Sequence, residues 1–360
     1  MSRVPVFTAE AALAAARTRV PAWPKANALA MYSSALGGIV TDPAVFAVPL
    51  DDHIVTRGHG VFDTCNIHNG KAYGLEFHLD RLFKSAAQAR IERLPSRDVI
   101  KEAILATLAT AGERDGVFAR FWLSAGRGDF AISSRGLAKN GAVGGEEGAA
   151  SFYAVVHRNA GAKGLEGEGL HEATVGVPLK NQLLATLKST NYLINALTAM
   201  EAEDKGGTLG VQLDEGGFIV ESSIASVAIV TPAGVLKSPS FDYALASTTV
   251  VRAFALAQSR LDADGPRLGL TKVVQEPVSL DEAYAASEMF LLGGGGVVPV
   301  ISLDGRRIGA GRPGPTFRWL WKLLDDDLRN EEHTDPIPYE LYAAHVQRRP
   351  RLAYRMSAGI

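Results

Sequence analysis

The spacing of hydrophobic and polar positions changes along the chain, and its period separates predicted strands from predicted helices. The apolar run 62–67 predicts a strand, and the sequence HNGK at 68–71 predicts the turn of a hairpin. The run 72–75 then predicts the returning strand. From Phe77 onward, apolar residues recur at helical spacing, which predicts an amphipathic helix.

Similar patterns continue to the C-terminal half. Further helices are predicted at about 98–111, 190–204 and 248–260, and further strands at 117–126 and 151–157, on both sides of the turn 214–217, and in a hairpin at 224–239. Because strands and helices alternate in both halves, the chain is predicted to be an α/β (α+β) protein with two domains.

A glycine-rich stretch at 158–173 is poor in large apolar residues and marks the domain boundary. We therefore predict a small N-terminal α/β domain at 1–160, an interdomain loop at 161–175 and a large C-terminal domain at 176–360. No G-x-G-x-x-G sequence opens a helix after a strand, so a dinucleotide-binding domain is not supported.

Composition narrows the class of function. The net charge of −2 argues against a broad surface for nucleic acid or anionic membranes. The one cysteine, Cys65, excludes an internal disulfide, and no spacing of His, Asp and Glu matches a metal site, so no metal is predicted. The uncharged flanks of Lys188 are long enough for a membrane span but hold too many Ser, Thr and Asn. The N-terminus weakly resembles a transit peptide, so the expected location is cytoplasmic, or plastidial if such a peptide has been removed.

Lys188 is the first candidate for chemistry, because it is the only charge in the stretch 183–200. A structural interpretation is that its stem lies along apolar surface, or that it pairs with a carboxylate. A functional interpretation is an amine whose pKa is lowered by burial, which is then a nucleophile and a proton carrier. A Schiff base with pyridoxal phosphate would also remove the cost of burying an ammonium group.

Other candidates have both structural and functional interpretations. Glu221 either ends a strand or pairs with a pyridinium nitrogen, which keeps a cofactor ring electron-withdrawing. The hydroxyl residues 247–249 start a predicted helix, where they either cap it or bind phosphate. The glycine run 293–296 either turns the chain or allows a ligand to approach closely. Arg120, inside a strand, either pairs structurally or receives a substrate carboxylate.

Six motifs in order carry a resemblance to a known family. They are RGHGVFDT (57–64), HLDRLFKSA (78–86), LKSTNYL (187–193), the strand that ends at Glu221, LASTT (245–249) and GGGGVVPVISLDGRRIG (293–309). Together they resemble the fold-type IV enzymes that use pyridoxal 5'-phosphate, from Met31 to about Phe317. Among the subfamilies, the segments LAMYSS, PLDDH and WLSAG are most similar to the plant-type D-amino-acid aminotransferases.

The resemblance implies a role for each matched residue. Lys188 would form the Schiff base and move the proton, Glu221 would hold the ring nitrogen, and Tyr192 would lie near the cofactor. The residues implied to bind the phosphate and the rest of the cofactor are Arg81, Ser247, Thr248, Thr249, Gly293 and Gly294. Arg57, His59 and Arg120 are the candidates for binding substrate.

Four departures from the family pattern leave the substrate undecided. Ser226 stands where an Asn is usual, Ser247 where a Gly is usual, Gly293 where a Thr is frequent, and Ala125 where bacterial D-amino-acid aminotransferases carry an Arg. These changes also raise the hypothesis that the cofactor is held weakly.

The resemblance implies a homodimeric transaminase that acts on small molecules. It would move the amino group of a D-amino acid, such as D-alanine, D-methionine or D-aspartate, to a 2-oxo acid such as 2-oxoglutarate or pyruvate. The alternatives are an aminodeoxychorismate lyase, which eliminates pyruvate, and a branched-chain L-amino-acid aminotransferase. Asn191 and Tyr192, three and four residues after Lys188, match the lyase and D-aminotransferase spacing. A cofactor-free binding protein is the non-enzymatic alternative, and the presence of Lys188 and Glu221 argues against it.

Overall fold

The chain is divided into two units in the structure, which is a computed structural model that describes residues 4–128, 130–135, 150–158 and 168–347. Unit 1 comprises Met1–Leu75, Ala89–Asn159 and Asp335–Arg355, and unit 2 comprises Glu76–Gln88, Ala160–Thr334 and Met356–Ile360. The predicted domains follow chain order, whereas each unit also takes a segment from the other half of the chain. Residues 161–167 of the predicted interdomain loop lie outside the described residues, so the loop stays a prediction there. Its last part is not a loop, because 170–172 and 174–175 form strands of unit 2.

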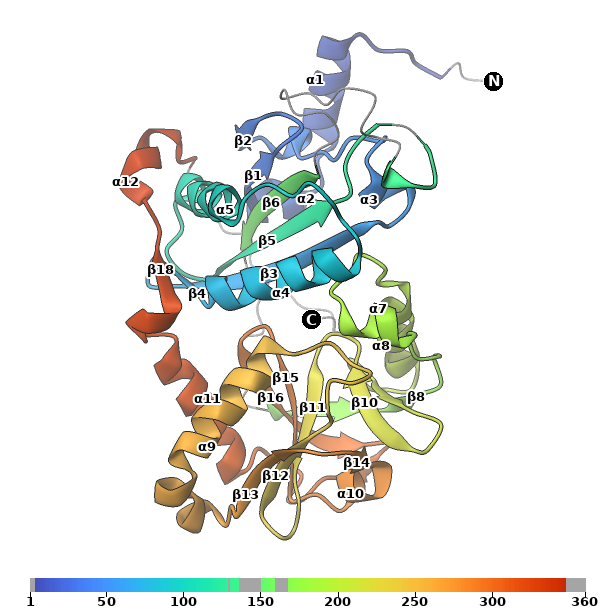
Figure 1. The fold of residues 1–360 in the computed structure, drawn as a ribbon, viewed down its shortest axis with the longest axis vertical. Coiled ribbons are helices and arrows are strands. Elements are labelled where there is room, and N and C mark those ends of the chain that lie inside the picture. Colours follow the sequence, from blue (N-terminus) through green and yellow to red (C-terminus); the bar gives the residue numbers. More distant parts are fainter. Residues whose placement is uncertain (1–3, 129, 136–149, 159–167, 348–360) are drawn as a thin grey trace. The chain divides into compact units, whose positions relative to one another are not determined.

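Unit 1 is built on one sheet whose strands lie in the order β18-β4-β3-β5-β6-β1-β2 (Figure 1). The pairings of β1 with β2 and β6, of β3 with β4 and β5, and of β5 with β6 are antiparallel. The strands are β1 (Ala28–Ser33), β2 (Gly38–Val40), β3 (Gly60–His68), β4 (Lys71–Tyr73), β5 (Val117–Ser124), β6 (Ser151–Arg158) and β18 (Thr334–Pro336).

The hairpin predicted at 62–75 is confirmed as β3 and β4. Asn69 and Gly70 form its turn with φ of 49° and 75°, in the left-handed region that Asn and Gly tolerate best. Side chains alternate on the neighbouring strand β5, because successive residues of a strand point to opposite faces. Ala119 and Phe121 are buried, whereas Arg120 between them is exposed on the other face.

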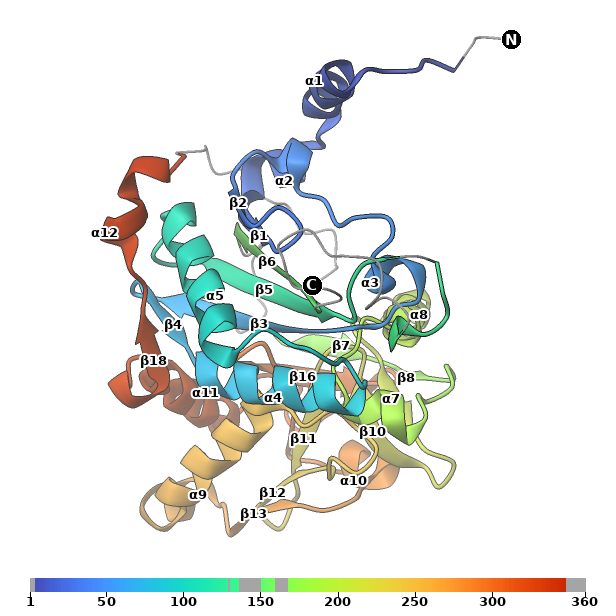
Figure 2. The ribbon, with the colours of Figure 1, turned by 45° about the horizontal axis from the view of Figure 1, so that its top comes forward.

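Helices of unit 1 differ in how much they bury. Helix α5 begins after the cap Ser96 and packs on β1, β5 and β6 (Figures 1 and 2). Helix α1, rich in alanine, buries no residue, so its alanine content rather than packing favours it. The helices are α1 (Ala9–Arg19), α2 (Ala22–Asn27), η1 (Pro43–Val45), α3 (His53–Thr56), α5 (Arg97–Ala111), α12 (Tyr339–Tyr342) and η4 (Ala343–His345).

Unit 2 contains two sheets, with orders β14-β10-β9-β8 and β13-β12-β11-β15-β16-β17, and β7 pairs with β16. Both mix parallel and antiparallel pairs: β8–β9, β12–β13 and β7–β16 are parallel. The strands are β7 (Leu170–Glu172), β8 (Thr174–Val175), β9 (Val211–Leu213), β10 (Phe218–Ser222), β11 (Ser226–Val230), β12 (Val235–Ser238), β13 (Lys272–Gln275), β14 (Val278–Ser279), β15 (Glu288–Gly293), β16 (Gly296–Leu303) and β17 (Arg306–Arg307).

Several helices complete unit 2. They are α4 (Leu75–Gln88), α7 (Gln182–Thr186), α8 (Leu193–Asp204), α9 (Thr248–Leu268), α10 (Leu280–Tyr284), α11 (Pro315–Asp327) and η3 (Glu331–His333). Among the described residues, none of the helices in either unit is both long and apolar enough to cross a bilayer.

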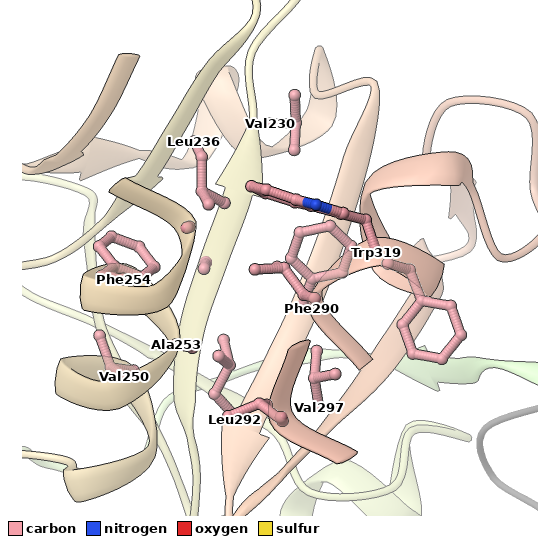
Figure 3. Packing of buried hydrophobic residues seen from close by; sticks show 14 of the residues in the cluster. Val230, Leu236, Val250, Ala253, Phe254, Phe290, Leu292, Val297 and Trp319 are labelled. Atoms are coloured by element: carbon pink, nitrogen blue, oxygen red, sulfur yellow. The ribbon is translucent and has the colours of Figure 1, made fainter. Parts of the chain in front are cut away.

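The core of unit 2 lies between its larger sheet and helices α9 and α11. Figure 3 shows Val250, Ala253 and Phe254 of α9 facing the strand residues Phe290 and Leu292. The cluster also includes an aromatic side chain of α11, Trp319, whose indole N–H donates to Asp264 of α9 over 3.0 Å. The two helices are therefore joined by apolar packing and by one partly buried polar contact.

The predicted end of helix α9 near residue 260 is wrong, because the helix continues to Leu268. The sequence LDADGP at 261–266 is typical of a break. In the structure, Leu261 and Leu268 pack against the core, and this tertiary contact outweighs the local preference. The helix ends instead at Gly269, whose φ of 69° forms a left-handed C-cap.

Gly234 provides a test of the close packing at this helix end. A Cβ there would lie 1.9 Å from the carbonyl oxygen of Gly269, and its φ is +77°. We expect Gly234→Ala to lower the free energy of unfolding by roughly 3 kcal/mol or more, at the upper end of single substitutions. The measurement is denaturant unfolding followed by circular dichroism.

The matched control is Gly305→Ala. Gly305 has a similar φ of +73°, but no atom lies within 4 Å of a Cβ built there. Only the backbone strain should remain, which costs about 1–2 kcal/mol. Equal losses in both variants would contradict the close approach at Gly234.

Candidate active site

The backbone of Lys188 is held where two short helices of unit 2 meet. Helix α7 ends at Thr186, Leu187 is buried, and Lys188 follows in a non-helical link to α8. The Lys188 N–H donates to the hydroxyl of Ser85 over 3.1 Å. Ser85 is buried in α4, so a helix distant in sequence fixes the position from which the lysine side chain extends.

The lysine amine meets a tyrosine. Lys188 Nζ lies 3.1 Å from Tyr192 Oη. The link between them is a tight bend in which the Asn191 N–H donates to Ser189 Oγ over 3.3 Å and the Tyr192 N–H to the Thr190 carbonyl over 2.9 Å. Tyr192 is the N-cap residue of α8. The bend therefore directs two functional groups, four residues apart, toward one another.

Glu221 belongs to the same unit and is largely buried beside two amines. Its carboxylate is 3.8 Å from Lys180 Nζ, and the two side chains are 12% and 10% exposed. Burial raises the pKa of Glu221, while the nearby charges of Lys180 and Lys188 and the Leu245 N–H act in the opposite direction. The carboxylate is therefore surrounded by donors and cations that compensate for its loss of water.

Lys180 was missed by the sequence reasoning. It follows β8 in the segment before α7, eight residues ahead of Lys188. Burial lowers its pKa, which the carboxylate of Glu221 partly reverses. The one local indication of a buried amine was a lysine within the mostly uncharged segment VGVPLKNQLL. Nothing in that segment indicates that the partner of Lys180 lies forty-one residues later.

The start of helix α9 supplies groups suited to an anion. Ser247 is the N-cap, and its hydroxyl accepts the Val250 N–H over 3.2 Å. The first N–H groups of a helix have no acceptor within it and point toward a bound anion. The two interpretations of Ser247, as helix cap and as phosphate ligand, are compatible. Its hydroxyl caps helix α9, and the N–H groups of Thr248 and Thr249 lie at this same N-terminal end of the helix.

Two other segments meet this helix end. Thr249 Oγ1 accepts the Gly295 N–H over 3.0 Å, which joins α9 to the glycine turn between β15 and β16. Arg81 of α4 donates to the Ala246 carbonyl over 3.1 Å. A cation, a helix N-terminus and a glycine turn are thus brought together from three parts of the chain.

The glycine turn is specified by backbone geometry. Gly294 and Gly295 have φ of 58° and 81°, which favour glycine. A Cβ at Gly293 would lie 3.2 Å from the Ile224 carbonyl oxygen, in the loop that follows Glu221. Gly293 therefore permits close approach of that loop. At Gly294, by contrast, no atom lies within 4 Å of a Cβ built there, so its positive φ is the reason for glycine.

The three predicted substrate residues all belong to unit 1, whereas the lysine group belongs to unit 2. Arg57 donates to the backbone carbonyls of Thr56, over 2.7 Å, and Phe130. A ring nitrogen of His59 lies 2.7 Å from the Ala89 carbonyl oxygen. The third, Arg120, donates to Thr64 Oγ1 over 3.1 Å. Their role in binding substrate stays a prediction.

Asp52 anchors the turn that carries Arg57 and His59. It is fully buried, accepts the Tyr153 hydroxyl over 2.7 Å and the Ile54 N–H over 2.9 Å, and also accepts the Ser124 hydroxyl. Burial and the adjacent carboxylate raise the pKa of Tyr153, which keeps it a donor. The network fixes helix α3 and hence the residues just after it.

The histidines near this turn were expected not to bind metal. The rings of His53 and His59 are 5.9 Å apart, and burial lowers the pKa of His53. In the part of the chain that the structure describes, no group of three or more His, Cys, Asp or Glu could hold a metal ion.

The chain is similar in sequence to known aminotransferases. Residues 60–303 match the amino-transferase class IV family. The D-amino-acid transaminase of Arabidopsis thaliana, described as chloroplastic, is 40% identical over 84% of this chain and 77% of its own length. A branched-chain-amino-acid aminotransferase-like protein 1 of Arabidopsis thaliana is 31% identical over 78% of this chain, which spans 48% of that protein.

The fold also matches solved structures. A crystal structure of a branched-chain amino acid aminotransferase with pyridoxamine 5'-phosphate has a TM-score of 0.71 and 22% identity, over 88% of this chain and 97% of that one. At this level of identity the similarity concerns the fold.

Arg81 allows the anion-binding groups to be tested. We expect Arg81→Gln to weaken binding of pyridoxal 5'-phosphate to the cofactor-free protein by roughly 10- to 100-fold, since a hydrogen bond to a charged group contributes about 1.5–3 kcal/mol. Equilibrium titration followed by absorbance measures this. Lys84→Gln, at an exposed position of the same helix, is the control and should bind as the wild type does. Equal affinity of all three proteins would exclude Arg81 from the phosphate site.

Proposed function

Because this chain belongs to the class IV aminotransferases, we propose that it transfers the amino group of a D-amino acid to a 2-oxo acid. The donors would be of the D-alanine, D-methionine or D-aspartate type, and the acceptor 2-oxoglutarate or pyruvate. The observation that carries this choice is the 40% identity with a D-amino-acid transaminase over most of both chains. The family and the fold expected from the six motifs are confirmed.

The donor set of unit 2 fits pyridoxal 5'-phosphate, the cofactor of this family. It offers an amine in Lys188, a largely buried carboxylate in Glu221 and, at the start of α9, N–H groups suited to an anion. The cofactor, when bound, supplies an aldehyde that captures amino groups and a ring that withdraws electrons.

The side chains around this cofactor would each have a separate role. Lys188 would attach the aldehyde and then carry the proton at Nζ, and the Tyr192 hydroxyl would orient that amine. Glu221 would accept the hydrogen bond of the ring nitrogen. The phosphate and the space beside it would be provided by Arg81, the N–H groups of Thr248 and Thr249, Gly293 and Gly294.

Arg57, His59 and Arg120 remain the proposed ligands for substrate carboxylates. The guanidinium of Arg120 is already oriented by Thr64 and lies over the ring of Phe62 at 5.6 Å from its centroid. A fork held in this way is suited to bidentate recognition of a carboxylate.

Two aspects of biology are proposed from the resemblance. The first is a homodimer, supported by the exposed apolar residues Leu193, Leu197 and Met200, which lie on one side of helix α8. The second is a cytoplasmic location, with the plastid as the alternative, which fractionation of the native cells would test.

The reaction is tested by product analysis after separate incubation with D-alanine plus 2-oxoglutarate, L-leucine plus 2-oxoglutarate, and aminodeoxychorismate alone. We expect pyruvate and D-glutamate from the first mixture. Lys188→Ala should lower the rate by at least about 1,000-fold, because its amine is both nucleophile and general base.

The three mixtures separate the alternatives. If only the mixture with L-leucine reacts, the protein is a branched-chain aminotransferase. If only the mixture with aminodeoxychorismate yields pyruvate, it is a lyase. A wild-type protein that binds no pyridoxal phosphate and turns over none of the three would reject the enzyme proposal.

The dimer is tested by a charge placed within the α8 side. We expect Leu197→Glu to convert the protein from a dimer to a monomer in sedimentation experiments, since an unpaired buried carboxylate at an interface is costly. Leu341→Glu, at a leucine of α12 that is 79% exposed, is the matched control and should leave the mass unchanged. A dimer that persists in Leu197→Glu would show that α8 is not in the interface.

A further inference from the structure

Lys180 lies close to Glu221 and Tyr192, two residues assigned to the cofactor, and the proposed reaction gives it no role. Its Nζ is 3.8 Å from Glu221 Oε1 and 5.2 Å from the centroid of the Tyr192 ring. Lys188 meets the same tyrosine through its hydroxyl. Lys180 therefore lies close both to the carboxylate of Glu221 and to the tyrosine that contacts the catalytic amine.

The pair is costly to bury, and each member compensates for the other. An isolated buried carboxylate takes up a proton, and an isolated buried ammonium loses one. Around Glu221, the groups that oppose its protonation are Lys180 from the segment before α7, Lys188 from the segment after it, and the N–H of Leu245. Lys180 makes the largest contribution among them and is the one amine that the proposed reaction does not consume.

The length of the contact matters for chemistry. At 3.8 Å, Lys180 and Glu221 attract each other but exceed the distance of a normal hydrogen bond. The carboxylate can therefore still accept a strong hydrogen bond from another donor. A cation placed beside the carboxylate lowers the proton affinity of that carboxylate more than the affinity of a more distant group, since the Coulomb effect falls with distance.

We propose that Lys180 is a positioning residue that keeps Glu221 ionised, so that the proton they share with the cofactor resides on the ring nitrogen. This inference rests on the proposed function, because it requires bound pyridoxal phosphate. Without Lys180, burial favours the neutral pair, in which Glu221 holds the proton and the ring nitrogen has none. A ring without that proton would withdraw electrons less strongly, and the nitrogen that Lys188 contributes would be more basic.

The test is a pH titration of the visible absorbance of the holoprotein. In Lys180→Met we expect the midpoint of the absorbance change to rise by about 1 pH unit, since a charge this close to a carboxylate shifts the carboxyl pKa by roughly 1–3 units and the ring transmits part of that change. The sign follows from the chemistry, since a more basic nitrogen releases its proton at a higher pH. Lys180→Arg keeps the charge and should titrate within a few tenths of a unit of the wild type.

A second pair of variants isolates the contribution of Glu221. Removing a cation could also act directly on the Schiff base. The double variant Lys180→Met/Glu221→Gln is therefore compared with the single variant Glu221→Gln. In this comparison the direct effect of removing the cation remains, whereas the effect that acts through the carboxylate is lost. We expect the shift to fall to less than half in the Glu221→Gln background. Lys180→Gln replaces Lys180→Met if the methionine variant does not fold.

The outcomes distinguish this inference from the proposed function. A wild-type protein without a cofactor band contradicts the proposed function. A normal wild-type band together with an unchanged midpoint in Lys180→Met overturns the role of Lys180. A shift of equal size with and without the Glu221→Gln substitution also overturns it, because Lys180 would then act without the carboxylate.

Discussion

The interaction on which the candidate active site depends is the compensation of a carboxylate, Glu221, where little water reaches it. Glu221 is 12% exposed, and its burial raises the pKa of its carboxyl group. Two lysines and a backbone N–H oppose that tendency. They come from different segments of unit 2, so the charge state of Glu221 is a property of the folded unit and not of the strand on which it lies.

The same folded unit also positions the groups proposed to bind the phosphate and the amine of Lys188. Helix α4 has two functions there, since its Ser85 holds the backbone of Lys188 and its Arg81 donates to the segment just before α9. Thr249 then ties the start of α9 to the glycine turn. Each contact is modest, but together they fix groups that would otherwise have to be ordered when the cofactor binds.

Local sequence predicts much of this architecture, where the signal is strong and short-range. The sequence HNGK favours a left-handed turn and predicted the hairpin β3–β4 correctly, and Ser247 marked the start of α9. The end of α9 was wrong, because the packing of Leu261 and Leu268 outweighs a local tendency to break the helix. Lys180 was missed for a related reason, since its partner is distant in sequence.

The family could be inferred, and candidates for the reactive groups proposed, from the linear order of residues. A lysine without charged neighbours, a glutamate at a strand end and six ordered motifs are all visible in one dimension, because composition and spacing record them. Which side chains share an environment became known from the folded chain: α4 belongs with unit 2, Tyr192 meets Lys188, and Lys180 lies against Glu221. Burial and Coulomb interaction depend on distance in space, which separation along the chain does not specify.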